Sequence, residues 1–159
     1  MKVWWVNQGT SYEASISGGY LWAPLKSSRG RELVYWAMMR EVRRGDLIVN
    51  CRKGQVVGIS IATSDAYYYD RPPAFQSYAW ERLKAGRRID VDMFELYPPI
   101  PLPAVSEDIQ RLRISQGPLN KNGHAKQSYL HRFSIEGIEI LRKASKSDWP
   151  SWVLVSDRR

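Results

Sequence analysis

The clearest structural signal in this chain is the segment 46–63, which reads DLIVNCRKGQVVGISIAT. Two apolar runs rich in β-branched residues, 46–51 and 55–63, flank the turn 52–54, and this pattern predicts two paired strands. Because both runs are mostly apolar, we expect both strands to be central and covered on their faces. The hairpin therefore predicts the sheet around which the rest of the chain is arranged.

Weaker signals for strands and helices lie on both sides of this hairpin. A helix is expected at 31–44, where apolar residues recur on one stripe, and Gly45 is expected to end it. The other expected strands are 2–7, 89–93 and 129–133, the other helices are 106–112 and 134–143, and 10–19, 67–73, 97–103 and 116–127 are expected to be loops or connectors. This order predicts an α+β domain built on one curved mixed sheet or small β-barrel flanked by short helices.

The composition of the chain bounds its class. With 159 residues it is expected to form one globular domain that needs neither a disulfide nor a metal ion. Its single cysteine, Cys51, follows an apolar run and is expected to be a buried free thiol, which fits a reducing, cytoplasmic location. No run approaches the roughly 20 apolar residues that span a bilayer, so we expect no membrane partner.

Aromatic residues and positive charge occur together in this chain. It has seven Trp and nine Tyr but only three Phe, and its net charge is +8. Flat rings can stack on bases while cations bind phosphates, so the combination favours a nucleic-acid binder with an aromatic pocket. The alternative is that the rings are ordinary core. Trp36 is expected in the core, Trp4 and Trp5 on opposite faces of one strand with at most one in the core, and both roles stay open for Trp22 and Trp80.

Catalysis has little support in the sequence. The two histidines, His124 and His131, stand apart from other metal-ligand residues, and no phosphate-binding glycine loop or nucleophile elbow is present. Asp90 and Asp92 share one face of a strand and could bind Mg²⁺, although such a pair more often decorates a solvent face. We therefore expect a non-catalytic module with no cofactor and no metal.

Several short motifs together resemble the EVE domain. The resemblance rests on residues 4–9 (WWVNQG), 18–24 (GGYLWAP), 42–48 (VRRGDLI), 57–59 (VGI), 108–109 (DI) and 127–130 (QSYL). Each motif is short, but their order and spacing are specific, and they extend over residues 2–143. EVE domains and the related YTH domains belong to the PUA-like superfamily, so the resemblance implies that fold.

The resemblance also implies a function. YTH domains bind N6-methyladenine in RNA through an aromatic cage, and similar modules bind methylated DNA in modification-dependent restriction proteins. By this analogy, Trp22 and Trp80 form two walls of a cage, and Trp5, Tyr12 and the 67–69 cluster are candidates for the third.

Further positions are carried over for the base edge and the phosphates. Asn7, Gln8 and Ser11 lie where such domains place polar groups that read the base, and Lys121 and Lys126 fall in the phosphate-binding loop. The basic pair 87–88, Arg87 and Arg88, is added as a second contact to the nucleic-acid backbone.

The resulting hypothesis is a reader of methylated double-stranded DNA that flips a modified base, N6-methyladenine or 5-methylcytosine, into its cage. It would be the targeting module of a restriction system, with residues 1–145 as the domain and 146–159 as a tail or linker towards a nuclease or NTPase partner. Two alternatives stay open: a PUA-like module that binds a modified RNA, and a small metal-dependent enzyme that acts on nucleotides through Asp90 and Asp92.

Overall fold

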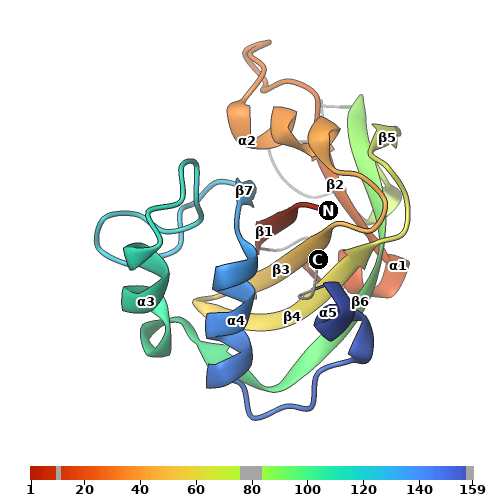
Figure 1. Ribbon diagram of the computed structural model, residues 1–159. Coiled ribbons are helices and arrows are strands. Elements are labelled where there is room, and N and C mark those ends of the chain that lie inside the picture. Colours follow the sequence, from red (N-terminus) through yellow and green to blue (C-terminus); the bar gives the residue numbers. More distant parts are fainter. Residues whose placement is uncertain (10–11, 76–83, 157–159) are drawn as a thin grey trace.

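The computed structural model describes residues 1–9, 12–75 and 84–156. Its centre is one curled mixed sheet with strand order β2-β6-β4-β3-β1-β7, and β5 pairs with β6 beside that path (Figure 1). The strands are β1 (Val3–Gln8), β2 (Tyr20–Pro24), β3 (Leu47–Arg52), β4 (Gln55–Ala62), β5 (Tyr67–Tyr68), β6 (Gly86–Pro101) and β7 (Leu130–Arg132). The predicted α+β fold on a curved mixed sheet is confirmed.

The hairpin that the sequence predicts is the middle of this sheet. β3 and β4 pair in antiparallel register, and the turn between them places Lys53 and Gly54 at positive φ, 49° and 72°. Such a turn matches the right-handed twist of the two strands. β1 then joins β3 in parallel, and β7 adds to the far edge of β1 in antiparallel register.

β6 is longer than predicted. The expected strand at 89–93 extends from Gly86 to Pro101, so describing 97–103 as a connector is wrong for most of its length. In the described sheet β2 and β5 pair with β6 only up to Asp90, and the prolines of β6 lie beyond that point with β4 on one side. Proline is tolerated there because one edge needs no backbone donor.

Two predictions about the first helices are wrong. The segment predicted as a loop at 10–19 contains helix α1 (Tyr12–Gly18), and the long helix predicted at 31–44 is reduced to α2 (Val34–Ala37) followed by the 3-10 turn η1 (Met38–Glu41). Val42 is extended, and the Asp46 carboxylate accepts a hydrogen bond from the Arg43 N–H at 3.0 Å, which replaces helical bonding.

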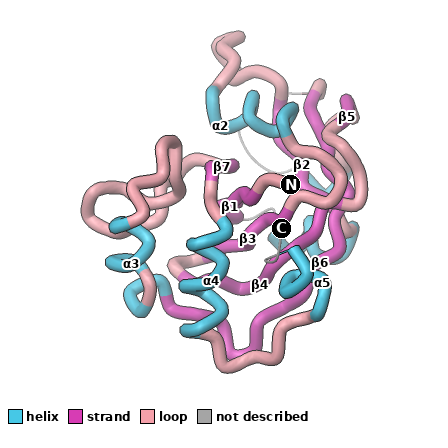
Figure 2. Tube along the Cα trace, in the orientation of Figure 1, coloured by secondary structure: helices cyan, strands magenta, loops and turns pink. Residues whose placement is uncertain are grey.

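The remaining helices cover the sheet. They are α3 (Ser106–Arg111), α4 (Ile135–Ala144) and α5 (Ser151–Ser156), with short 3-10 turns η2 (Pro73–Phe75) and η3 (Leu102–Ala104) (Figure 2). α3 and α4 were predicted, and the Ser134 hydroxyl caps α4 by accepting from the Gly137 N–H. No helix in the described part of the chain is long and apolar enough to cross a membrane. The boundary after residue 145 stays a prediction, while Val153 of α5 packs into the core.

Both faces of the sheet are packed, which explains the fate of the tryptophan pair. Trp5 lies in the core formed under α3 and α4, and Trp4 lies in the core formed with Met38 and Met39 of η1. Both side chains are buried, so the expectation that only one of them could be core is wrong. Alternation along β1 sends the two rings to opposite faces, and here each face meets a hydrophobic layer.

Candidate nucleic-acid pocket

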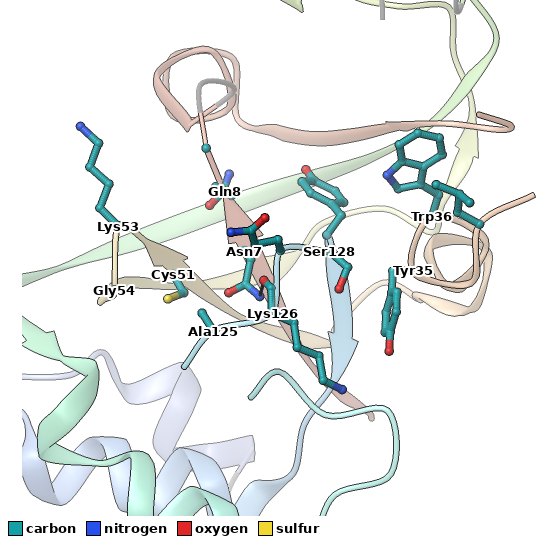
Figure 3. A pocket seen from close by; sticks show the side chains of 14 residues that line it. Asn7, Gln8, Tyr35, Trp36, Cys51, Lys53, Gly54, Ala125, Lys126 and Ser128 are labelled. Carbon is teal, nitrogen blue, oxygen red and sulfur yellow. Dashed lines mark hydrogen bonds between the residues drawn. The ribbon is translucent and has the colours of Figure 1, made fainter. Parts of the chain in front are cut away.

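A cavity of about 740 Å³ opens where the end of β1 meets α2, the β3–β4 turn and the segment before β7. Figure 3 shows the side chains that line it, among them Gln8, Tyr35, Trp36, Lys53 and Lys126. The volume falls in the range of about 300–1,000 Å³ typical of small-ligand sites. Because α2 is a single turn that ends early, Tyr35 and Trp36 face this cavity instead of a continuous helix interface.

The aromatic side of the cavity is supported from behind. The Tyr35 ring packs on the His131 imidazole with ring centroids 4.4 Å apart, and the Lys126 ammonium lies 5.7 Å from the Tyr35 centroid. His131 is fully buried, so it holds the ring at a fixed depth. A half-buried tyrosine with a cation beside it is suited to stack on an electron-rich base that carries a phosphate nearby.

Asn7 of β1 connects this strand to the segment before β7 that carries Lys126. Its side-chain oxygen accepts from the Trp5 indole N–H at 2.7 Å, and its amide donates to the Lys126 carbonyl at 2.9 Å. The Asn7 backbone N–H also donates to the Tyr129 carbonyl at 2.9 Å. Asn7 therefore positions the segment that carries Lys126, and its side-chain groups are engaged within the protein.

Gln8 presents a polar group whose direction is set by a buried chain of hydrogen bonds. The Ser60 hydroxyl donates to the Asn50 side-chain oxygen at 2.7 Å, and the Asn50 amide donates to the Gln8 side-chain oxygen at 2.9 Å. All three residues are buried, and Gln8 itself is 5% exposed. The Gln8 oxygen is engaged, and its NH₂ makes no hydrogen bond to the described residues. Gln8 lines this cavity and also a smaller one that Asn50 and Ser60 share.

His131 and Ser128 form a contact that looks catalytic but is electronically unsuited to that role. The His131 Nε2 lies 3.0 Å from the Ser128 carbonyl and 3.2 Å from its hydroxyl. An Nε2–H that donates to the carbonyl cannot accept the hydroxyl proton. Burial lowers the pKa of His131 to about 4, with a smaller contribution from Lys126, so the ring is also a weak base.

Three of the residues assigned to the site by resemblance meet at this cavity: Asn7, Gln8 and Lys126. Trp5 and Trp22 do not line it. Trp5 packs edge-on against Phe133 at 5.0 Å, and Trp22, at 0% exposure, packs against Phe75 at 5.5 Å while its indole N–H donates to the Tyr69 carbonyl. Gly86 permits this burial, because a Cβ there would lie 2.3 Å from the indole.

Tyr12 and Lys121 also lie apart from the cavity wall. Tyr12 is buried in α1 beneath the Arg52 guanidinium, which is 4.6 Å from its ring centroid. Lys121 is exposed in the loop after α3, where its backbone carbonyl accepts from the Gln110 amide at 2.9 Å. Ser11 and Trp80 fall outside the described residues.

The basic pair 87–88 is engaged within the protein. Arg88 pairs with Asp90 at 2.7 Å and lies between the rings of Tyr20 and Tyr69, 4.4 and 4.7 Å from their centroids. Arg87 approaches Glu32 at 3.9 Å. The same ion pair, with the Tyr67 hydroxyl donating to the carboxylate at 3.1 Å, accounts for Asp90 as a structural group. No cluster of three metal-ligand side chains occurs among the described residues.

Sequence reasoning missed Tyr35 and Trp36 as cavity residues, because the predicted long helix placed Trp36 in its packed face. It also missed Lys53 in the hairpin turn. Cys51 is a buried free cysteine as predicted, and burial raises the pKa of its thiol to about 12. The sequence did contain a signal that this helix would be short. The segment 26–32 is polar, so it offers little apolar surface with which a long buried helix could begin.

Comparison with known proteins establishes the fold class. No protein-family model and no curated protein matches the chain. Among solved structures, a Pseudomonas putida protein is 13% identical over 89% of this chain and 98% of its own, with a TM-score of 0.59. A mutant ASCH protein from Zymomonas mobilis is 11% identical over 91% of this chain and 97% of its own, with a TM-score of 0.54.

A third similar structure is the YTH domain of the Zygosaccharomyces rouxii MRB1 protein in complex with N6-methyladenosine RNA. It is 9% identical over 92% of this chain and 89% of its own, with a TM-score of 0.52. At these identities the likeness concerns the fold alone. The chain has a PUA-like fold of the kind found in YTH and ASCH domains.

Proposed function

We propose that this protein is a non-catalytic reader that takes a methylated base of a nucleic acid into the cavity beside Tyr35 and Trp36. The observation that carries the proposal is a cavity of about 740 Å³ that brings together the Gln8 amide, the Tyr35 and Trp36 side chains and two lysines. The Gln8 oxygen is held by Asn50, so its NH₂ is the group that a ligand acceptor would meet. The similar fold of a YTH domain that binds N6-methyladenosine RNA adds support.

The free energy gained by binding a base in the cavity must offset the cost of removing that base from its stack. A base must leave its stack to enter a cavity, at a cost of a few kcal/mol. Stacking on a protein ring contributes about 1–3 kcal/mol per base, and phosphate contacts from Lys53 and Lys126 would contribute the rest. An added methyl in an apolar site is worth only about 1–3 kcal/mol, so selectivity for the modified base is expected to be modest.

The Gln8 donor specifies which edge of the base is read. Because Asn50 holds the Gln8 oxygen, the cavity offers an N–H and requires an acceptor on the ligand. N6-Methyladenine and 5-methylcytosine both carry ring-nitrogen acceptors, so both satisfy this requirement. The proposed ligand is a methylated base in double-stranded DNA, and the proposed setting is the targeting module of a modification-dependent restriction system that works with a nuclease or NTPase.

Of the residues carried over by resemblance, Asn7, Gln8 and Lys126 line the cavity. Trp22 would have to lose its contact with Phe75 before it could touch a base, because it is buried in a separate cluster with Tyr20 and Phe75. Trp80 and Ser11 remain proposed contacts.

A second candidate function is recognition of a modified RNA. It is favoured by the N6-methyladenosine RNA in the similar YTH structure. An RNA reader would bind single strands and respond to the 2′-hydroxyl.

The test is a fluorescence-anisotropy titration with four matched oligonucleotides at one fixed salt concentration. They are duplexes with N6-methyladenine, with 5-methylcytosine and with no modification, and a single-stranded RNA with N6-methyladenosine. A preference for one methylated duplex that Tyr35→Leu abolishes and Tyr97→Ala leaves intact supports the DNA reader. Preference for the RNA selects the second candidate, and equal affinity for all four overturns both.

A further inference from the structure

Exposed apolar side chains gather on one part of the described surface. Apart from Met1 and Tyr97, the strongly exposed large apolar residues are Leu33, Val34, Tyr68 and Tyr69. They belong to two segments that are far apart in the sequence, one leading into α2 and the other in and after β5. In Figure 1 both segments lie in the upper part of the molecule, β5 beside β6 and α2 to its left.

Arg87 of β6 joins the two segments. Its guanidinium approaches the Glu32 carboxylate at 3.9 Å and lies over the Tyr68 ring, 5.7 Å from the centroid. The Leu25 N–H also donates to the Ala85 carbonyl at 3.0 Å, which ties the loop before α2 to the start of β6. We call Leu33, Val34, Tyr68, Tyr69 and Arg87 the tyrosine platform.

The platform is held in shape before any ligand arrives. Tyr68 pairs with Arg87 in the β5–β6 ladder, and the Tyr69 N–H donates to the Gly86 carbonyl at 3.0 Å. The Tyr69 ring lies 4.7 Å from the Arg88 guanidinium, which is itself fixed by Asp90. Tyr68 nevertheless remains 75% exposed, so a rigid backbone displays a ring that is largely in solvent.

The charge around the platform is positive. The segments 25–34, 67–71 and 84–88 contain seven Lys or Arg residues against two carboxylates, Glu32 and Asp70. Glu32 is shared by Arg40 and Arg87. Four exposed cations have no carboxylate partner among the described residues: Lys26, Arg29, Arg31 and Lys84. The charge is complementary to a polyanion.

We infer that the tyrosine platform binds unpaired nucleotides next to the base held in the proposed pocket, on a strand that is locally opened there, with a nucleobase stacked on Tyr68. The inference rests on the proposed function and extends it from one base to the strand that carries it. Leu33 belongs to both the cavity lining and the exposed platform, so the two surfaces are continuous. A strand that leaves the pocket over Leu33 would reach Tyr68 across the contact between Glu32 and Arg87, where a phosphate would meet the arginine.

Nucleic acid fits this surface better than a protein or a membrane does. Exposed tyrosines with arginine behind them offer one free ring face and nearby cations, the arrangement that nonspecific single-strand binders use. A lipid surface would be met by a larger aliphatic face with tryptophan or leucine.

The test compares Tyr68→Ala with Tyr97→Ala, a matched control whose ring is 77% exposed near the opposite end of β6. Affinity is measured by anisotropy for a methylated oligonucleotide with single-stranded flanks and for the methylated nucleoside alone. We expect Tyr68→Ala to weaken binding of the flanked oligonucleotide about tenfold and to leave nucleoside binding unchanged. Tyr68→Phe, which keeps the ring, should retain the wild-type affinity.

The outcomes separate this inference from the proposed function. If Tyr68→Ala binds as well as Tyr97→Ala while Tyr35→Leu loses binding, the platform is overturned and the pocket stands. If Tyr68→Ala loses affinity and the methylated-to-unmodified ratio is 1 even in the wild type, the strand surface stands and the modified-base pocket is overturned. If neither Tyr68→Ala nor Tyr35→Leu changes affinity, both are overturned. A melting temperature for each variant confirms that it is folded.

Discussion

The chemistry proposed for this protein depends at the residue scale on the direction of one amide. Gln8 could offer a donor or an acceptor, and its neighbours decide which. The buried Ser60 hydroxyl donates to Asn50, Asn50 donates to Gln8, and the Gln8 N–H groups are left for the cavity. A chain of this kind imposes a polarity on the site, because each member is committed by the one before it.

Replacement of Gln8 tests that polarity. In Gln8→Glu one carboxylate oxygen can still accept from Asn50, while the other turns a second acceptor towards the acceptor of the base. We expect ligand affinity to fall by about tenfold or more, equivalent to about 1.4 kcal/mol, because a hydrogen bond is replaced by repulsion. Anisotropy titration measures the loss. An unchanged affinity in a folded Gln8→Glu variant would show that Gln8 does not touch the ligand.

His131 predicts a pH dependence of stability. Burial lowers its pKa from 6.5 to about 4, so the unfolded chain takes up the proton first as the pH falls. The contribution to stability is complete above pH 6.5 and is lost between pH 6.5 and about pH 4, by a total of about 3 kcal/mol. Urea unfolding across this range should show a steeper loss for the wild type than for His131→Leu. Parallel curves would contradict the assignment.

At the element scale, Asp46 holds the first residues of β1 and the residues after η1 close to the start of β3. Its carboxylate accepts from the Lys2 N–H at 2.9 Å, the Trp4 indole N–H at 3.0 Å and the Arg43 N–H at 3.0 Å. One buried side chain thus joins the beginning of β1, the beginning of β3 and the end of η1. The same contacts stop the helix that the apolar stripe at 31–44 predicts, because Asp46 satisfies the backbone where the helix would continue.

Removing this carboxylate should therefore be costly. Asp46→Ala leaves three donors without their acceptor, and we expect the free energy of unfolding to fall by about 3 kcal/mol. Denaturant unfolding monitored by tryptophan fluorescence is the measurement. Asp108→Ala on the exposed surface of α3 is the control, with an expected change below about 0.5 kcal/mol. If the two substitutions lowered the free energy of unfolding equally, the hydrogen bonds of Asp46 would not be stabilising the fold.

On the scale of the whole molecule, the net charge is +8, but only some of the basic side chains are available to bind a nucleic acid. Many arginines are paired inside the protein, as Arg88 is with Asp90 and Arg132 with Glu41. Among the described residues, cations at the cavity rim and around the tyrosine platform are left for a phosphate backbone. Overall charge therefore overstates the number of contacts available to a nucleic acid.

The salt dependence of binding should count these contacts. Lys126→Gln at the cavity rim is expected to reduce the slope of log K against log salt by about 1, because one phosphate contact is lost. Lys143→Gln, near the end of α4, is expected to leave the slope unchanged. Affinity titrations at several salt concentrations give both slopes. The same slope for both variants would place the phosphate path away from Lys126.

The sequence by itself determined the elements whose signals are local. The hairpin 47–62 follows from two apolar runs and a glycine turn, the start of α4 follows from Ser134, and the ordered motifs indicated the PUA-like fold. The hairpin and the start of α4 each depend on neighbours within a few residues, and the motifs are recognisable by their order along the chain.

Only the tertiary structure decided the cavity. Asn50 and Gln8 are 42 positions apart, and they meet because β1 lies parallel to β3. Tyr35 and Trp36 reach the cavity from a helix that is one turn long, and Trp22 is buried because Gly86 of β6 admits its ring. Strand register and the space left between strands are properties of the assembled sheet, so no local pattern could assign the contact between Asn50 and Gln8 or the burial of Trp22.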